Sequence, residues 1–307
     1  MTYPIIEVPE GAPSQLEQLG TKSKFWYRNE RGKRVMFKRG RPGTGENWAE
    51  KVCCEICRLL ELPHAEYDFA SANAGDCKGV VSPTFVPKGS TLILGNELLA
   101  SVEPGYEKTK RYRTRQHTLG RVHVVLTKTK IALPLGYQPP ETGEMARAFD
   151  VFTGYLLLDA LVSNQDRHHE NWGLVFSPDT GLFLAPTFDH ASSLGRNETD
   201  ERRLERLSTR DSGYSVQSYV SRAESALYSG VASRKPYTTI SAFENAAKRS
   251  PSAARYWGDK LSLCSSENFE EIFNNIPDSE ITEPARRFAL KMLEVNAERL
   301  SNPGILK

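Results

Sequence analysis

Nine consecutive polar residues, Ser163 to Asn171 (SNQDRHHEN), are the feature that most constrains how this chain folds. They follow Ala146–Val162, an apolar stretch with a helical pattern, and precede Trp172–Phe176 (WGLVF), a run typical of a buried strand. A second short strand is predicted at 182–184, so the two strands flank a turn. The polar segment is therefore predicted to be a loop that carries chemistry between buried elements.

The carboxylate and amide groups of this loop are spaced as in phosphoryl transfer. Asp166 and Asn171 form the pattern D-x-x-x-x-N, and Asp189 lies eighteen residues beyond Asn171. In that chemistry the first Asp takes or orients the proton of the acceptor, and the Asn and the later Asp offer hard oxygen ligands to Mg²⁺. The neighbouring histidines keep a transition metal open as an alternative ion.

A lysine and a glutamate nearer the start of the chain match the phosphate-binding strand of the same chemistry. Val35–Lys38 (VMFK) has the form V-A-I-K, in which the lysine steadies the α- and β-phosphates and pairs with a glutamate on the next helix. Glu50 is the natural partner, but it also suits a capping box that begins at Asn47, and both interpretations stay open. Gly20–Lys24 (GTKSK) is a weak phosphate loop, because it has one glycine.

The order of predicted elements divides the chain into two unlike regions. Residues 1–86 carry four predicted strands and one helix, which begins after Asn47. The strands are predicted at 23–29, 33–39, 66–71 and 78–86. Residues 87–307 are predicted to be mainly helical, with a mobile polar segment at 192–215 and four or five closing helices, the last at 283–300.

The charges of the chain nearly cancel, with 40 Lys+Arg, 38 Asp+Glu and a net charge of +2. Residues 1–130 hold 21 basic and 14 acidic side chains, and the remainder hold 19 and 24. The balance gives no global attraction to nucleic acid or anionic lipid, so direct nucleic-acid binding is not expected. No signal peptide is predicted, and no apolar run reaches the ~20 residues of a membrane helix. We therefore expect a cytoplasmic protein without membrane contact.

The five cysteines are a poor disulfide framework. Cys53, Cys54 and Cys57 fall on one predicted helix, and His64 follows it. The group could form a zinc cluster, but Cys54 lies off the face of the other two and no second C-x-x-C is present. Small buried helix residues are the preferred interpretation.

Several motifs occur in the same order as in the HipA-like serine/threonine kinases of bacteria, including the smaller CtkA-type members, and the chain resembles that family. The most specific match runs from Leu158 (LDAL) through Asn164–His168 (NQDRH) to Asn171–Gly173 (NWG). Further matches are Gly20–Trp26, Phe37–Lys38, Trp48–Glu50, Glu61–Pro63 and Leu184–Asp189. The resemblance implies a two-lobe, protein-kinase-like α+β fold, with a small antiparallel sheet in an N-lobe of residues 1–86 and a mainly helical C-lobe of residues 87–307.

The resemblance also implies roles in the C-lobe, with ATP and Mg²⁺ as cofactors. Asp166 is the expected catalytic base, and His168 takes the place of a phosphate-facing lysine. Asn171 and Asp189 are the expected metal ligands. The usual D-F-G is replaced by Asp189-His190-Ala191, so the regulatory packing of a Phe at this point is not assumed.

In the N-lobe, the resemblance implies that Lys38 binds the α- and β-phosphates and that Glu50 orients it. The remaining nucleotide contacts are expected from the phosphate loop (Gly20, Lys22, Ser23 and Lys24) and from a hinge near Ser82 and Phe85. Val35 and Met36 are expected to face Leu174 or Phe188 across the adenine.

The implied activity is transfer of the γ-phosphoryl group of MgATP to a protein Ser or Thr, with a toxin-like or effector role. Autophosphorylation near the phosphate loop has Ser14, Thr21 and Ser23 as local candidates. HipA carries an additional subdomain before its phosphate loop, whereas only about twenty residues precede Gly20 in this chain. A separate small antitoxin or subdomain-like protein is therefore an expected partner.

Three alternatives stay open at this point. The first is phosphorylation of a small molecule or a lipid head group. The second is a metal-dependent phosphohydrolase that uses the carboxylates and histidines of the two loops (Asp166, His168, His169, Asp189 and His190). The third is a catalytically silent module that binds ATP.

Overall fold

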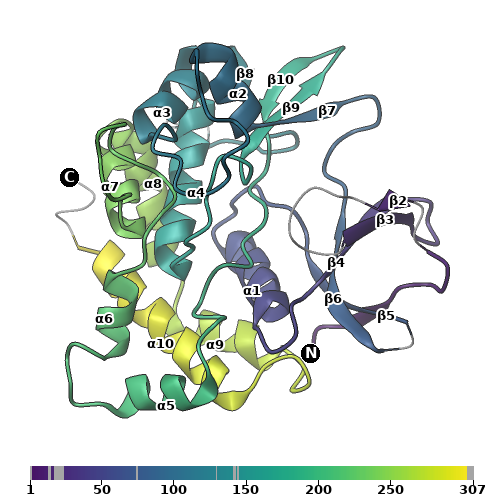
Figure 1. The fold of residues 1–307 in the computed structure, drawn as a ribbon, viewed down its shortest axis with the longest axis vertical. Helices are drawn as coiled ribbons and strands as arrows, with labels where there is room; N and C mark the ends of the chain where they lie inside the picture. The colour runs from purple at the N-terminus through teal and green to yellow at the C-terminus, as the bar shows by residue number, and fades with distance from the viewer. Residues whose placement is uncertain are drawn as a thin grey trace.

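The computed structural model describes residues 2–12, 15–16, 24–73, 75–128, 130–140, 143 and 145–302. Its first part is a six-stranded sheet in the order β1-β5-β6-β4-β3-β2, on the right in Figure 1. The strands are β1 (Ile5–Glu7), β2 (Gln15–Leu16), β3 (Lys24–Arg28), β4 (Arg34–Arg39), β5 (Asp68–Ala72) and β6 (Cys77–Pro83). All neighbours are antiparallel except β1, which pairs with β5 in parallel.

The predicted hairpin at 23–39 is confirmed as β3 and β4. Its turn is held by Asn29, whose side-chain oxygen accepts hydrogen bonds from the backbone N–H groups of Arg31 and Lys33. Side chains alternate along β4. Val35 therefore points into the small apolar core of the first sheet, and Met36 shares the opposite face with Lys38. The expectation that Val35 and Met36 lie on the same side is therefore wrong, because successive residues of a strand point to opposite faces.

Helix α1 (Glu46–Leu59) begins at Glu46, and Gly45 before it provides no side-chain cap. Asn47 therefore lies inside the helix, and the capping box predicted between Asn47 and Glu50 is wrong. The backbone N–H of Gly45 donates to the carbonyl of Arg196, and Glu46 in the first turn accepts from the backbone N–H of Arg41. Tertiary contacts thus fix the start of the helix and leave Glu50 for another partner.

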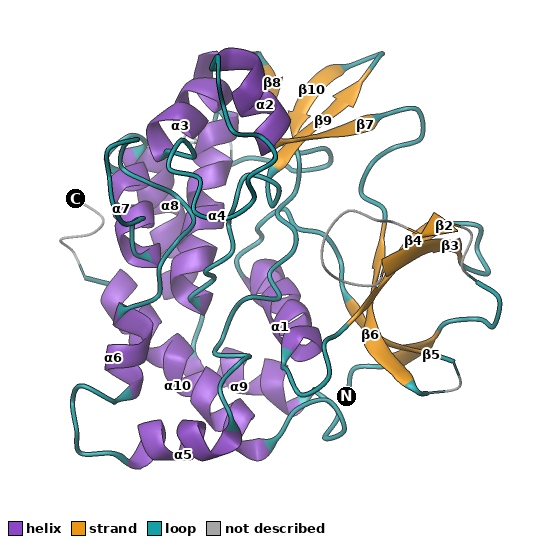
Figure 2. Ribbon diagram, in the orientation of Figure 1, coloured by secondary structure: helices purple, strands orange, loops and turns teal. Residues whose placement is uncertain are grey.

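The second part of the molecule is mainly helical and carries a second sheet (Figure 2). The sheet has the order β7-β9-β10-β8, with β7 (Thr91–Leu94), β8 (Ile131–Ala132), β9 (Gly173–Ser177) and β10 (Gly181–Leu184). The helices are α2 (Gly95–Val102), α3 (Leu119–Lys128), α4 (Ala148–Val162), α5 (Asp200–Ser208), α6 (Val216–Ser221), α7 (Thr239–Ala247), α8 (Pro251–Ser262), α9 (Ser266–Asn274) and α10 (Glu283–Leu300). No helix in the described ranges is long and apolar enough to cross a membrane.

Most predicted elements of this part are confirmed, and one segment differs. The hairpin at 172–184, the long apolar helix and the closing helices are present as β9–β10, α4 and α6–α10. The polar stretch 192–215, predicted to be a mobile surface segment, contains α5. Thr199 caps that helix, and Arg203 is buried with hydrogen bonds to Asp200 and the carbonyl of Gly195. The sequence pattern is misleading here because α5 buries an arginine rather than an apolar stripe.

Helix α1 connects the two parts because it packs against both. It contacts β5 and β6 on one side and α9 on the other, as Figure 1 shows. Trp48 lies against Phe273 of α9 with ring centroids 6.5 Å apart, and Ile56 belongs to the same core as α4. All fifteen residues of α4 are buried, so this helix is the centre of the second part. The chain crosses from the first sheet to the second between Pro83 and Thr91, and the lobe boundary at residues 86/87 stays a prediction.

Candidate active site

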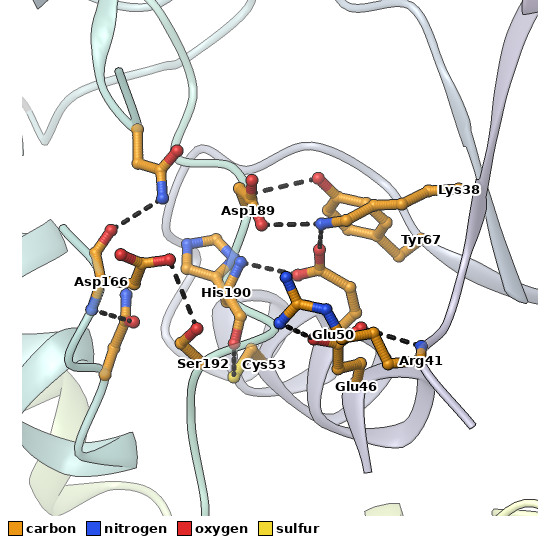
Figure 3. A network of polar contacts seen from close by, with 12 residues as sticks. Lys38, Arg41, Glu46, Glu50, Cys53, Tyr67, Asp166, Asp189, His190 and Ser192 are labelled. Atoms are coloured by element: carbon orange, nitrogen blue, oxygen red, sulfur yellow. Dashed lines mark hydrogen bonds and ion pairs between the residues drawn. The ribbon is translucent and has the colours of Figure 1, made fainter. Parts of the chain in front are cut away.

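Three charged side chains from distant segments meet between the two parts of the molecule (Figure 3). The Nζ atom of Lys38 on β4 donates to Oε1 of Glu50 on α1 at 2.6 Å and to Oδ1 of Asp189 at 2.7 Å. Glu50 is buried and Lys38 nearly so, whereas the Asp189 side chain is 40% exposed. Lys38 therefore lies beside its predicted partner Glu50, and it also contacts Asp189, the predicted metal ligand, which was not predicted to contact it.

The carboxylates keep Lys38 charged despite its burial. Burial alone would lower the pKa of Lys38, but the nearby carboxylates of Asp189 and Glu50 outweigh it and hold that pKa well above its ordinary value. Lys38 therefore remains an ammonium ion throughout the neutral pH range. A fixed cation in a protected site is what binding of anionic phosphate oxygens requires.

The backbone around Asp189 is held in an uncommon conformation by two further contacts. Asp189 has φ of 58°, in the left-handed region, and its N–H donates to the Tyr67 hydroxyl at 3.2 Å. The next N–H, that of His190, donates to Oε2 of Glu50 at 2.6 Å. Glu50 thus fixes Lys38 with one oxygen and the Asp189 loop with the other.

A buried ion pair supports the polar loop after α4. Arg167 is fully buried, and its guanidinium donates two hydrogen bonds to Asp159, at 2.8 and 2.7 Å. The same guanidinium donates to the carbonyl of Asn171 at 2.8 Å, and the amide of Asn164 donates to Asp159. An arginine that holds a carboxylate with two nitrogens and a carbonyl with the third is rigid, so it fixes the loop that carries Asp166.

Asp166 and Asn171, both in this loop, are linked directly. The Asn171 amide nitrogen donates to the carbonyl of Asp166 at 2.7 Å, which leaves the amide oxygen as the atom that can bind a metal. The Ser192 hydroxyl donates to Oδ2 of Asp166 at 3.4 Å. Carboxylate oxygens from Asp189 and an amide oxygen from Asn171 fit Mg²⁺, which prefers hard oxygen ligands.

His168 lies beside Asp166 but differs from the lysine it was expected to replace. Burial, with Arg111 close by, lowers the pKa of His168 to about 4, so the ring is neutral at pH 7. Its Nδ1 accepts the N–H of Glu170 at 3.1 Å, and therefore Nε2 carries the proton, 3.7 Å from Oδ1 of Asp166. A neutral ring lacks the positive charge that a phosphate-facing lysine supplies.

Of the expected hinge residues, Ser82 lies in the first sheet and Phe85 follows its strand β6. Ser82 on β6 is buried and pairs with Met36 on β4, so both share the face of Lys38. Phe85 stacks on Phe188, with ring centroids 5.7 Å apart, and packs on the small apolar cluster that Tyr67 joins. Leu174 is buried in the large core.

The expected phosphate loop can be placed only in part. Gly20, Lys22 and Ser23 lie outside the described residues, as do Ser14 and Thr21. Lys24 starts β3 and pairs with Lys38 across the strands, so the two lysines share one face of the sheet.

A contact between the two parts, which was not predicted, links the start of α1 to Asp166. Arg196 binds Glu46 through its guanidinium and donates to the Ser192 hydroxyl at 3.0 Å, and Ser192 in turn donates to Asp166. Tyr67 and Ser192 were also not predicted. None of these residues belongs to a sequence motif, because each acts through a contact with a residue far away in the chain.

A cavity of about 340 Å³ opens beside Asp166. Asp166 and His168 form part of its wall, with Arg111, Tyr112 and Arg113 from the basic loop at 107–115. The ring of Tyr112 meets that of His168 edge-on at 5.7 Å, and Arg111 forms an ion pair with Glu170. The polar loop therefore has access to a space that a second reactant can enter.

A sheet with one helix, a helical part and a charged site between them define a two-lobe, kinase-like α+β fold. The chain is similar to the crystal structure of the Helicobacter pylori proinflammatory kinase CtkA, with a TM-score of 0.72 and 17% identity over 97% of this chain and 98% of that one. It is also similar to a chain in the structure of the Shewanella oneidensis MR-1 toxin–antitoxin system HipA, HipB and its operator DNA. There the TM-score is 0.54 and the identity 13%, over 97% of this chain and 67% of that one.

No protein-family model and no curated protein matches the chain. The two similarities to solved structures confirm, at the level of the fold, the motif-based resemblance to CtkA-type and HipA-like kinases.

Proposed function

We propose that this chain is a kinase that transfers the γ-phosphoryl group of MgATP to a hydroxyl group, with a protein Ser or Thr as acceptor. The observation that carries the proposal is the direct contact of Lys38 with both Glu50 and Asp189. A lysine held between an orienting and a metal-binding carboxylate is the arrangement that phosphoryl transfer requires.

Each of the site residues has one role in this proposal. MgATP would supply the phosphoryl group, with the ion neutralising charge on the phosphate oxygens. Asp189 and the amide oxygen of Asn171 would hold the ion, and Lys38 would bind the α- and β-phosphates. Asp166 would accept the proton of the attacking hydroxyl, because its carboxylate is 28% exposed and lines the cavity described above. His168, being neutral, would position Asp166 rather than bind phosphate.

The cavity beside Asp166 is the proposed acceptor site. Arg113 is exposed at this cavity, while the charge of Arg111 is balanced by Glu170. Glu224 is the acid of the lining other than Asp166. The exposed Arg113 and Glu224 carry opposite charges, so this lining gives the acceptor peptide no net charge preference.

Transfer of label from γ-labelled ATP tests the proposal. The chain is incubated with labelled ATP, Mg²⁺ and a cell lysate, and labelled proteins are hydrolysed to identify the phosphorylated amino acid. We expect labelled Ser or Thr, and a loss of at least about 100-fold in Asp166→Asn, the range for a general base. Asp179→Asn, in the exposed turn between β9 and β10, is the matched control and should transfer label normally.

The same assay separates the other functions. Labelled lipid or small molecules would replace the protein acceptor, free phosphate alone would indicate a hydrolase, and nucleotide binding without turnover would indicate a silent module. Among the described residues, the carboxylates and histidines of the two loops do not form a cluster of three metal-ligating groups, which counts against the hydrolase. Instead His190 is buried against Thr187, and His169 against Tyr106.

Regulation and partners belong to the proposal as well. Mass spectrometry of the ATP-treated chain tests autophosphorylation at Ser14, Thr21 and Ser23. The structure from S. oneidensis contains HipB beside HipA. Co-expression with small proteins encoded next to this chain's gene tests for a separate small antitoxin-like partner. Growth assays test for a toxin-like or effector role.

A further inference from the structure

A cysteine, a histidine and a glutamate come together beside the carboxyl-terminal half of α1. Cys54 is on α1, and His64 and Glu66 follow the helix in the segment that leads to β5. Their ligand atoms all lie within 4.8 Å of one another, and this is the one group of three or more such side chains in the described ranges. Cys53 and Cys57, the neighbours of Cys54 in sequence, are buried in the large core instead.

The histidine is oriented as metal-binding histidines are. Nδ1 of His64 lies 2.7 Å from the carbonyl oxygen of Leu62, which can only accept, so Nδ1 carries the proton. In the neutral ring Nε2 therefore presents a lone pair, and it is a buried atom with no hydrogen-bond partner. A backbone carbonyl on one ring nitrogen, which leaves the other nitrogen for the ion, is the usual support of a metal-bound histidine. An unpartnered buried nitrogen is otherwise unfavourable, because it has lost its hydrogen bonds to water.

The Glu66 carboxylate lies close to both of the other groups, with one of its oxygens near each. Cys54 Sγ lies 3.7 Å from Oε2 of Glu66, and His64 Nε2 lies 3.6 Å from Oε1 of Glu66. A tetrahedral ion with bonds of about 2.0–2.3 Å places its ligand atoms about 3.3–3.8 Å apart. Arg58 binds Oε2 of Glu66, which leaves Oε1 directed toward the histidine. The Glu66 side chain is 48% exposed, so an ion can enter from solvent.

We propose that Cys54, His64 and Glu66 form a binding site for one divalent transition-metal ion, and that their sulfur, nitrogen and oxygen ligands select Zn²⁺. A thiolate and an imidazole favour Zn²⁺ over Mg²⁺ or Ca²⁺, which prefer oxygen. Burial raises the pKa of Cys54 to about 12, so the free thiol is protonated and binding releases its proton to solvent. Three protein ligands leave the fourth position to water.

The position of this site connects it to the proposed active site, and this consequence rests on the proposed function. Cys54 lies one turn beyond Glu50 on the same face of α1. The segment that carries His64 pairs with Thr187 through hydrogen bonds of 2.9 Å, two residues before Asp189. A bound ion would tie α1 to the segment before Asp189, and so hold Glu50 and Asp189 in register.

Titration with Co²⁺, a spectroscopic substitute for Zn²⁺, tests the site without any activity measurement. The whole chain is freed of metal with a chelator and titrated under reducing conditions. We expect one Co²⁺ per chain, with a thiolate-to-cobalt absorption band that one equivalent of Zn²⁺ abolishes. Cys54→Ser and His64→Gln should lose the band and weaken Zn²⁺ binding by more than about 100-fold, since loss of an outer partner alone costs about 10–100-fold.

Two controls keep the test decisive. Cys57→Ala removes a buried thiol of the same helix, and Cys264→Ser removes a half-buried thiol elsewhere; both should keep the band. Glu66→Gln changes a half-exposed side chain and is not expected to unfold the chain, so it tests the site if Cys54→Ser does not fold. The proposal is overturned if wild type shows no thiolate band at one equivalent, if Cys54→Ser retains it, or if Glu66→Gln binds Zn²⁺ as tightly as wild type. Because binding is measured directly, failure of the kinase assay would leave these results unaffected.

Discussion

The ion pair between Lys38 and Glu50 predicts a strongly non-additive effect of two substitutions on stability. Lys38→Met removes the cation with little change in length, and Glu50→Gln removes the anion with little change in shape. If the two charges stabilise each other in the folded chain, removing both should cost less than the sum of the two single losses.

The magnitude follows from the burial of each partner. At 2.6 Å the attraction is ~6 kcal/mol for an effective dielectric constant of ~20, and desolvation offsets much of it. Lys38→Met leaves the Glu50 carboxylate, 1% exposed, without its ammonium partner, so we expect a loss of about 3–5 kcal/mol. Glu50→Gln leaves Lys38 with the half-exposed Asp189, so we expect about 1–2 kcal/mol. The double variant should lose about 2 kcal/mol less than the sum.

Equilibrium unfolding in urea, followed by circular dichroism, measures all four proteins. Lys291→Met is the matched control, because Lys291 pairs with Glu294 at the surface and its loss should change stability by less than about 0.5 kcal/mol. Additive losses within about 0.5 kcal/mol, or a smaller loss in Lys38→Met than in Glu50→Gln, would refute the reasoning. Both single variants should also lose label transfer, and that loss is measured separately from stability.

Three further predictions concern the metal ligand, the link between the lobes and the response to acid. Asp189→Asn should abolish label transfer while shifting the melting temperature by less than about 4 °C, since Asp189 is partly exposed; transfer at the wild-type rate would contradict its role. Arg196→Gln should lower kcat about 10-fold with KM unchanged, because Arg196 positions Asp166 through Ser192. The control Arg206→Gln changes a comparably buried arginine outside the site and should leave kcat unchanged. Burial lowers the pKa of His117 to about 3, below the value of about 6.5 in the unfolded chain. Between pH 8 and pH 5 only the unfolded chain takes up this proton, so the free energy of unfolding should fall by about 2 kcal/mol as the pH falls through that range. His117→Gln should remove that share of the pH dependence in urea titrations, and an unchanged slope would argue against it.

The elements with strong local patterns were predictable from sequence. The β3–β4 hairpin combines alternating apolar residues with an Asn-initiated turn, and α4 is a long run that is mostly apolar. The spacing of Asp166, Asn171 and Asp189 follows from a loop and a hairpin of fixed length. These features depend on neighbours in sequence, which is why a pattern reveals them.

Elements stabilised by distant contacts were missed. Helix α3 (Leu119–Lys128) and the short strands β7 and β8 were not predicted, and α5 lies in a stretch that was predicted to be a mobile surface segment. In α5 the buried group is Arg203, which no apolar periodicity marks. Strand β7 has only four residues and becomes a strand through pairing with β9.

The sequence alone determined which chemical groups this protein has and their order along the chain: a lysine on a strand, a glutamate on the next helix, and an Asp, Asn and Asp around a hairpin. Only the tertiary structure decided between the two interpretations of Glu50, because a helix cap and an ion-pair partner look the same in sequence. It also placed His64 and Glu66 beside Cys54, which helical spacing had already separated from the face of Cys53 and Cys57. The physical reason is the same in both cases: a side chain's partner is set by packing between elements far apart in the chain, and sequence spacing records only what lies within one turn or one strand.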